Sequence, residues 1–253
     1  MMTLVIAGKE LRSLFLSPLA WVILAVVQLI LAYLFLSQID FFLQIQPRLA
    51  GLEEAPGITE IIVAPLFGNA AVVLLLVVPM LTMRLVSDER RNRTLSLMFS
   101  APLSMTEIIL GKFLGLMAFL LLMLVLIAAM PLALLAGGSP DLGVLASSFL
   151  GLLLLVGSFA AIGLYMSTLT SQPAIAAVST FGVLLLLWIL DWAGSGRGGE
   201  ASTVFGYLSI LRHYEPLLKG VFNSTDIVYY LLLMMTFLVL SVRRLDAERL
   251  LGR

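Results

Sequence analysis

The chain has 253 residues, of which 61% are hydrophobic and 12% are charged. A water-soluble domain carries about 25% charged residues, so this composition excludes an ordinary soluble domain and requires a lipid environment. The absence of cysteine excludes a disulfide framework and a cysteine metal site, and the net charge of zero gives the chain no electrostatic attraction to nucleic acid.

Six apolar stretches are long enough to cross a bilayer, whose hydrocarbon core takes about 20 helical residues within a range of about 17–25. They cover residues 19–36, 64–86, 108–136, 142–169, 174–190 and 227–242. The third and fourth are longer than a straight crossing requires, so we expect tilting, extension beyond the membrane, or a break near Pro131. The sequence therefore predicts an all-α polytopic membrane protein that forms one domain over residues 1–253.

Lysine and arginine are concentrated on one side of these six stretches. Eleven of the 15 lie on that side. The four on the other side are Arg48, Arg197, Arg212 and Lys219. Because lysine and arginine mark the cytoplasmic side and the number of stretches is even, we expect both termini in the cytoplasm.

An amphipathic segment, residues 3–17, precedes the first stretch. Its apolar side chains can share one face of a helix, formed by Leu4, Val5, Leu11, Leu14 and Phe15. The other face carries Lys9, Glu10 and Arg12. Such a helix lies in the plane of the membrane interface. An ordinary juxtamembrane flank is the alternative; a cleaved signal peptide is disfavoured, because both this segment and the apolar run after it are long for one.

Residues 87–107 join the second and third stretches and combine charges with apolar side chains. The charges are Asp88, Glu89, Arg90, Arg91 and Arg93, and the apolar side chains that follow are Leu95, Leu97, Met98 and Phe99. Pro102 then stops the short helix that these residues predict, and Ser104 with Glu107 forms a capping box for the third stretch. A partner protein's groove would bury the apolar side chains; the alternative is a loop that only sets the topology.

Residues 191–226 lie on the external side and are too polar to cross the membrane, yet too apolar to be free in water. Apolar residues recur there at helical spacing, Phe205 and Leu208 among them. This pattern predicts one or two short helices that dip into the outer leaflet. His213, two residues before Glu215, lacks the companions of a metal site, so a structural or interfacial role is expected.

Several kinds of chemistry are missing from the sequence. Gly111-Lys112 lacks the remaining residues of a phosphate-binding loop, so the chain does not bind ATP by that route. Gly111-x-x-x-Gly115 fits a helix-packing pattern. Arg84, Lys112 and Asp191 lie near the ends of their stretches and are expected to reach the interface. Mid-membrane charges, which an ion-coupled carrier would need, are therefore scarce, and an intramembrane enzyme is equally disfavoured.

The order of these features resembles the permease subunits of type-2 ABC exporters over essentially the whole chain. Its most specific part runs from Glu89 through Thr94-Leu95 and Ala101-Pro102-Leu103 to Gly111-Lys112. Residues 213–230, which begin with His213-Tyr214-Glu215, are similar to the gliding-motility-type branch of this family, in a looser match.

The resemblance implies roles for three segments. Residues 1–18, with Lys9, Glu10 and Arg12, would be the elbow helix. Residues 191–226, with Phe205, Leu208, His213 and Glu215, would hold external re-entrant helices. Residues 87–107 would hold the cytoplasmic coupling helix that seats on a separate ATPase subunit. Its contact residues would be Glu89, Arg90, Arg91, Thr94, Leu95, Leu97, Phe99, Pro102 and Leu103.

The resemblance also implies partners and a location. Two permeases, either two copies or two paralogues, would assemble with two ATPases in the bacterial inner membrane. The partner subunit would hold ATP and Mg²⁺, and this chain would hold no cofactor. ATP hydrolysis would then drive export of an unidentified substrate. The alternative within the same family is mechanical work on a periplasmic accessory protein, for which the acidic external loop 37–63 could serve.

Overall fold

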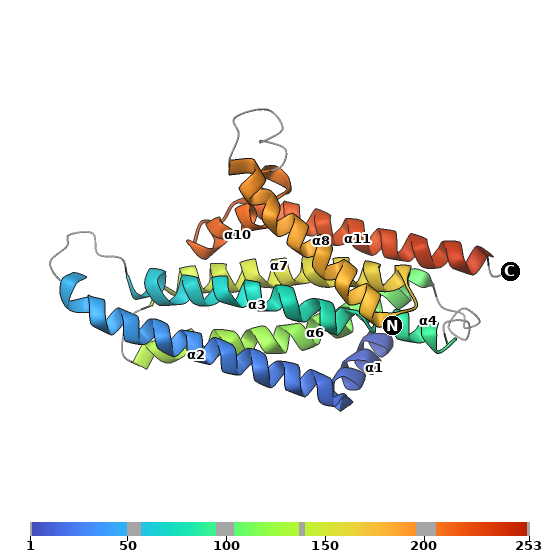
Figure 1. Cartoon of the computed structure of the whole chain (residues 1–253), viewed down its shortest axis with the longest axis horizontal. Helices are drawn as coiled ribbons and strands as arrows, with labels where there is room; N and C mark the ends of the chain where they lie inside the picture. Colours follow the sequence, from blue (N-terminus) through green and yellow to red (C-terminus); the bar gives the residue numbers. More distant parts are fainter. Residues whose placement is uncertain (1, 50–56, 95–103, 137–139, 196–205, 252–253) are drawn as a thin grey trace.

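The computed structural model describes residues 2–49, 57–94, 104–136, 140–195 and 206–251, and every regular element in these ranges is helical. Six of the helices are long and apolar enough to cross a membrane. Most of them run along the length of one bundle, whereas α8 (Pro173–Ser195) is inclined to it (Figure 1). The prediction of an all-helical protein with six membrane-crossing helices is confirmed.

The two ends of the bundle carry different short elements (Figure 1). At one end, called proximal below, lie α1 (Met2–Leu16), α4 (Ser87–Arg91) and the last turns of α11 (Ser224–Leu251). At the other, distal end lie the last turns of α2 (Pro18–Leu49), a π-helical turn η1 (Thr59–Val63) and a 3₁₀ turn η2 (Ala133–Ala136).

Two membrane-crossing helices are longer than the apolar stretches that predict them. α2 continues past the predicted end at Leu36 to Leu49, and α11 continues past Val242 to Leu251. Hydropathy detects only the part of a helix that lies in lipid. The residues beyond that part mix polar, charged and apolar side chains, and Pro47 lies inside α2 without ending it. The helix therefore continues where the uninterrupted apolar run stops.

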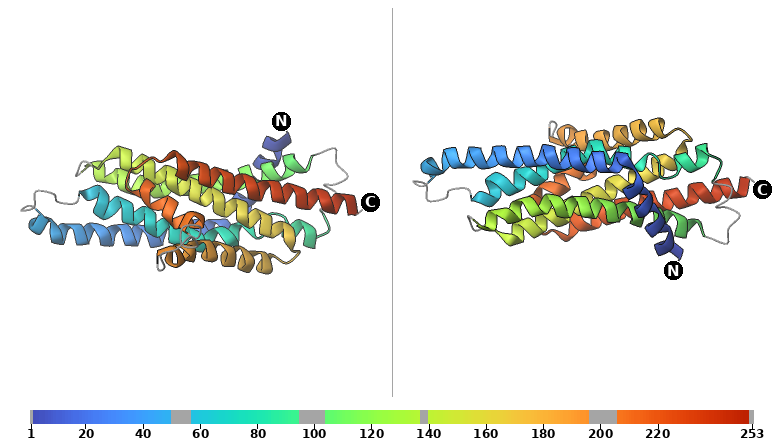
Figure 2. Two further views of the ribbon diagram at one scale, coloured as in Figure 1. Left: turned by 90° about the horizontal axis from the view of Figure 1, so that it is seen from above. Right: turned by 90° about the horizontal axis from the view of Figure 1, so that it is seen from below.

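A proline separates α1 from α2. Pro18 has no backbone N–H and has a fixed φ, which suits the first position of α2 and prevents α1 from continuing through it. α1 then lies across α6 (Met105–Leu132) instead of running parallel to it (Figure 2).

The apolar side chains of α1 divide between the bundle and the outer surface. Leu11, Leu14 and Phe15 pack against the core, together with Ile6. Leu4 and Val5 are 70% and 66% exposed. The contact of α1 with α6 extends from Ile6, beside Gly111, to Phe15, beside Phe119, and Leu4 and Val5 lie off this face.

The predicted capping box at the start of α6 is confirmed. The Ser104 hydroxyl accepts a hydrogen bond from the Glu107 N–H at 3.1 Å, and the Glu107 carboxylate accepts one from the Ser104 N–H at 3.1 Å. α6 does not break at Pro131 but ends one residue later, where the chain tightens into η2.

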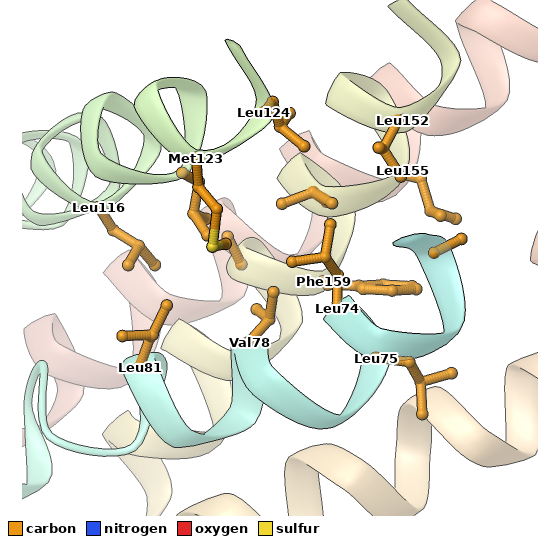
Figure 3. Close-up of a cluster of buried hydrophobic side chains, with 14 of the residues drawn as sticks. Leu74, Leu75, Val78, Leu81, Leu116, Met123, Leu124, Leu152, Leu155 and Phe159 are labelled. Atoms are coloured by element: carbon orange, nitrogen blue, oxygen red, sulfur yellow. The ribbon is translucent and has the colours of Figure 1, made fainter. Parts of the chain in front are cut away.

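α7 (Leu142–Leu169) is the central helix of the bundle, packed against α3 (Ala64–Thr82), α6, α8 and α11. Figure 3 shows the contact of three of these helices: Leu74 and Val78 of α3 and Met123 of α6 converge on Phe159 of α7. All four side chains are fully buried. A hydrophobic core of this kind fixes the bundle on which the short elements at both ends are mounted.

Small residues let other helices approach α7 closely. A Cβ on Gly163 would lie 2.2 Å from the Thr82 hydroxyl oxygen of α3, and one on Gly151 would lie 2.9 Å from Leu217 Cβ. Leu217 belongs to α10 (Ile210–Leu218), a short helix inside the predicted external segment. α10 therefore rests directly on the backbone of α7.

Candidate functional site

A buried lysine holds two glutamates together at the proximal end. Lys112 of α6 is 1% exposed, and its Nζ donates to Glu10 Oε1 of α1 at 2.8 Å and to Glu89 Oε1 of α4 at 2.6 Å. The expectation that Lys112 reaches the interface is therefore wrong. Its side chain is covered by α1 and α4, which supply the counter-charges that a buried ammonium needs.

Close packing of α1 on α6 brings Glu10 to Lys112. A Cβ on Gly111 would lie 2.7 Å from Ile6 Cβ, and one on Gly115 would lie 2.7 Å from the Ala7 carbonyl oxygen. The Gly111-x-x-x-Gly115 pattern thus does serve helix packing, and its partner is α1. Without side chains at these two glycines, the backbone of α1 approaches close enough for Glu10 to reach Lys112.

Backbone groups at the start of α4 bond to α7. The Ser167 hydroxyl oxygen accepts hydrogen bonds from the N–H groups of Val86 and Ser87, at 3.0 and 3.1 Å, and its own hydrogen goes to the Met83 carbonyl. Ser167 is fully buried. This hydroxyl satisfies two N–H groups that the first turn of a helix leaves without partners.

α4 also contacts α11. Arg90 Nη2 donates to both carboxylate oxygens of Glu248 at 2.6 Å. Together with Lys112 and Ser167, this pair attaches a helix of five residues to α1, α6, α7 and α11. Among these contacts, the second oxygen of Glu89, Oε2, is buried without a hydrogen-bond partner in the described structure.

A basic cavity of about 1030 Å³ opens beside α4 and the first residues of α8. Arg84, Arg90, Arg91 and Arg93 line it, with Asp88 as the acidic side chain. Arg91 is exposed. The surplus of positive charge makes this surface suited to an anionic partner.

The chain changes direction at the C-terminal end of α4, next to this cavity. Arg93 has a φ of 57°, which is uncommon for a residue with a side chain. The Thr94 N–H and hydroxyl both donate to the Glu89 carbonyl, at 3.0 and 3.2 Å. Thr94 thus secures the end of α4. The other predicted contact residues of this segment lie outside the described residues: Leu95, Leu97, Phe99, Pro102 and Leu103.

The charges predicted on the N-terminal helix separate in the structure. Lys9 and Arg12 are exposed, whereas Glu10 turns to Lys112. Sequence reasoning missed this link and the role of Glu248. A lysine just inside an apolar stretch was the available signal, because a lysine that cannot reach water requires carboxylates nearby.

On the distal side, α10 presents one face to the bundle. Its buried residues are Ile210, His213, Tyr214 and Leu217, spaced as one helical face. Leu208 and Glu215 of the predicted re-entrant set are exposed, and Phe205 lies outside the described residues.

Hydroxyl groups fasten α10 to the helices beneath it. The Ser147 hydroxyl donates to the Leu217 carbonyl at 2.7 Å, and the Tyr214 hydroxyl donates to the Phe67 carbonyl at 3.0 Å. Carbonyls in the last turn of a helix have no partner within it, so Ser147 supplies one from α7.

Within the described residues, no cluster of three or more His, Asp or Glu side chains could hold a metal ion. The polar groups at both ends therefore join helices to one another and do not form a metal centre there. The arrangement joins the short elements at both ends to the membrane-crossing helices.

Comparison with known proteins agrees with this architecture. No curated protein matches the chain. The family described as ABC-2 family transporter protein matches residues 4–250, nearly the whole length. Six apolar helices and this match identify the chain as a multi-pass membrane permease component of an ABC transporter, and it belongs to the ABC-2 transporter family.

Proposed function

We propose that the chain is the permease subunit of an ATP-driven exporter, in which residues 87–107 receive the movement of a separate ATPase subunit. The observation that carries the proposal is the attachment of α4, which opens this segment, to four other helices. Lys112 joins α4 to α1 and α6, Ser167 joins it to α7, and Glu248 joins it to α11.

Such an attachment makes α4 a rigid connection. The ion pairs that hold it are 2.6–2.8 Å long, and Lys112 is shielded from water. A displacement of α4 therefore shifts the helices bonded to it before it breaks the contacts. When the ATPase closes on ATP, the proximal ends of α1, α6 and α11 move with α4 and open a path along the bundle.

The remaining parts of the proposal follow the family pattern. α1 acts as the elbow helix, with Lys9 and Arg12 facing the membrane interface. Leu97 and Phe99 seat the coupling helix on the ATPase, each contributing about 2 kcal/mol or more, as buried contact residues do. The ATPase holds ATP and Mg²⁺, and this chain carries out no catalysis.

We also propose the assembly and orientation. Two permeases face each other in the bacterial inner membrane, with both termini in the cytoplasm and the proximal end toward the ATPases. α10 and its neighbours then form the external re-entrant segment, a proposal supported by the seating of α10 on Gly151 of α7, more than two turns inside that helix. The similarity of residues 213–230 supports placement in the gliding-motility-type branch.

The test is affinity purification of the tagged chain from its own membranes in mild detergent, with mass spectrometry of what accompanies it. We expect an ATPase that bears a phosphate-binding loop. It should be lost in the Leu97→Asp/Phe99→Asp variant and retained in the matched distal variant Val221→Asp/Phe222→Asp, whose two side chains are also apolar and are half exposed. Absence of any ATPase, or equal loss in both variants, would contradict the proposal.

A second candidate function is mechanical work on a periplasmic accessory protein. It is favoured by the last turns of α2, which extend beyond the other elements at the distal end in both figures of the whole chain (Figures 1 and 2). Phe41 and Leu43 are each 56% exposed there. Purification under the same conditions distinguishes the two functions, because the mechanical function requires a second protein that is lost in a Phe41→Asp/Leu43→Asp variant.

A further inference from the structure

A buried histidine lies between two hydrogen-bond acceptors on the distal side of the bundle. His213 of α10 is 6% exposed, and Asp226 of α11 is 5% exposed. His213 Nδ1 lies 2.6 Å from Asp226 Oδ1, and Nε2 lies 3.0 Å from the Tyr207 carbonyl oxygen. A carbonyl oxygen can only accept, so Nε2 must carry a hydrogen.

We propose that His213 is held as an imidazolium that donates from both ring nitrogens, and that the bound proton fastens residues 206–218 to α11. A neutral imidazole has a single N–H and can serve only one of the two acceptors. The geometry therefore requires a second proton, which resides either on Nδ1 of the ring or on the carboxyl group of Asp226.

Two contacts place this proton on the ring. Asp226 lies in the first turn of α11, where the helix dipole stabilises a negative charge. The ring of His213 is stacked on that of Tyr229 with centroids 4.1 Å apart, and the face of an aromatic ring attracts a cation. Both contacts stabilise the imidazolium and carboxylate over the neutral pair, and they must offset the cost of Asp226 Oδ2, which is buried without a hydrogen-bond partner in the described structure.

Asp226 is the charged partner of His213. The other ionisable side chains that touch the ring, Tyr207 and Tyr229, are phenols, and Tyr230 packs against Tyr229. Phenols stay protonated near neutral pH. They therefore do not compete with Asp226 for the imidazolium.

The elements around α10 supply no other partner in the described structure. Arg212 and Glu215 of α10 itself are exposed. α3 carries no ionisable side chain, and the one on α7, Tyr165, packs against Phe237. Asp191 of α8 forms no ion pair with His213 within the described residues. Asp226 is therefore the ion-pair partner of His213 in the described structure.

Loss of the second proton weakens the hold of α11 on the segment. The hydroxyls of Tyr229 and Tyr230 donate to the carbonyls of Leu208 and Ile210 at 2.8 Å each, and these bonds persist at neutral pH. Loss of the histidine proton removes one donor and the positive charge. Without that proton the Nδ1 donor to Asp226 is missing, and the two phenol bonds and the stacking of His213 on Tyr229 remain between the segment and α11.

The chain contains a single histidine, which makes the test direct. The full chain, purified with a histidine-free tag and labelled with ¹⁵N-histidine, is placed in lipid bilayers for solid-state NMR. We expect two protonated ring nitrogens at neutral pH and the loss of one N–H signal as the pH is raised. An unprotonated Nδ1 at neutral pH overturns the proposal, because the second proton would then reside on Asp226.

Two matched variants test whether the negative charge of Asp226 is what keeps His213 protonated. Asp226→Asn keeps the shape but removes the charge, so one of the two N–H signals should be lost at neutral pH. Asp191→Asn makes the same change on α8 and should keep both signals. Retention of both signals in Asp226→Asn contradicts the assignment, and the titration of the unmodified chain decides it if that variant does not fold.

A distance measurement tests whether the His213–Asp226 contact fastens residues 206–218 to α11. The chain has no cysteine, so spin labels can be placed at Glu215→Cys on α10 and Met235→Cys on α11, both exposed positions. We expect a narrow distance distribution at neutral pH that broadens over the pH range in which the N–H signal is lost. A distribution that stays narrow through that loss overturns the fastening role.

Discussion

At the proximal end a short helix is held mainly by charges, whereas on the distal side a short helix is held mainly by packing and hydroxyl groups. α4 buries only Ser87, and its position depends on the contacts of Glu89 and Arg90. α10 buries four side chains and bonds through Ser147 and Tyr214 as well.

The difference indicates how each element responds to force or mutation. A helix held by a buried ion pair loses its position when a buried charge such as that of Lys112 is removed, because its partners are left unpaired. A helix held by packing and several neutral hydrogen bonds loses a smaller part of its attachment with each substitution. Under the proposed function, the proximal contacts would transmit the movement of the ATPase, whereas the distal contacts hold α10 in place on the bundle.

Replacement of the buried lysine should have the largest effect. Lys112→Met leaves Glu10 and Glu89 facing each other without a counter-charge, and removing one partner of a buried ion pair costs about 3–5 kcal/mol. This loss of stability is measured as a decrease in the free energy of unfolding in detergent. The exposed Lys9→Met variant is the control and should change stability by about 0.5 kcal/mol or less; equal effects would remove the distinction between the two lysines.

Crowding of the α1–α6 contact should come next. A Cβ added by Gly115→Ala would lie 2.7 Å from the Ala7 carbonyl oxygen and 2.8 Å from Glu10 Cβ. α1 must then shift, at a cost of about 1–3 kcal/mol. Gly182→Ala, where nothing lies within 4 Å, is the control in the same thermal unfolding assay. A stable Gly115→Ala chain would show that α1 is loosely seated.

Loss of one distal hydroxyl should have a moderate effect. Tyr214→Phe removes the donor to the Phe67 carbonyl and should cost about 1 kcal/mol. Burial raises the pKa of the Tyr214 phenol well above its ordinary value. The contribution is therefore fully present below the ordinary tyrosine pKa of about 10, and the difference between the two chains should not change with pH near neutrality. The exposed Tyr33→Phe is the comparison; a loss above about 3 kcal/mol would exceed what one hydroxyl can supply.

The partly exposed pair Arg90–Glu248 should have the smallest effect on stability. Its side chains are 18% and 26% exposed, and ion pairs open to water contribute about 0.2–1 kcal/mol. A double-mutant cycle with Arg90→Gln and Glu248→Gln measures the coupling. The parallel cycle with Arg244→Gln, whose Nη2 lies 3.8 Å from the same carboxylate, should give less. A larger coupling for Arg244–Glu248 would mean that Glu248 pairs within α11 and does not hold α4.

The sequence predicts the membrane-crossing helices well, because hydropathy and capping are local properties. The box at Ser104 and Glu107 involves neighbouring residues and could be recognised without a fold. The ends of α2 and α11 could not be predicted from the sequence, because nothing in the apolar pattern marks a helix that continues outside lipid.

The polar contacts of the site could be predicted only in part. Lys112 bonds to Glu10 and Glu89, which lie 102 and 23 residues away in the chain. A charge near the end of an apolar stretch fits both an interfacial lysine and a buried one, and only the crossing of α1 over α6 decides between them. His213 is similar, because its partner Asp226 belongs to another helix.

The central claim is that the proximal end, with α4, faces an ATPase. The direct measurement places a photoactivatable cross-linker on a cysteine at Asn92, beside α4, or at Phe41 on the distal part of α2, in native membranes of the otherwise cysteine-free chain. The account predicts that Asn92→Cys captures a protein with a phosphate-binding loop and that Phe41→Cys does not. Capture of that protein at Phe41, or its absence at Asn92, would contradict the account.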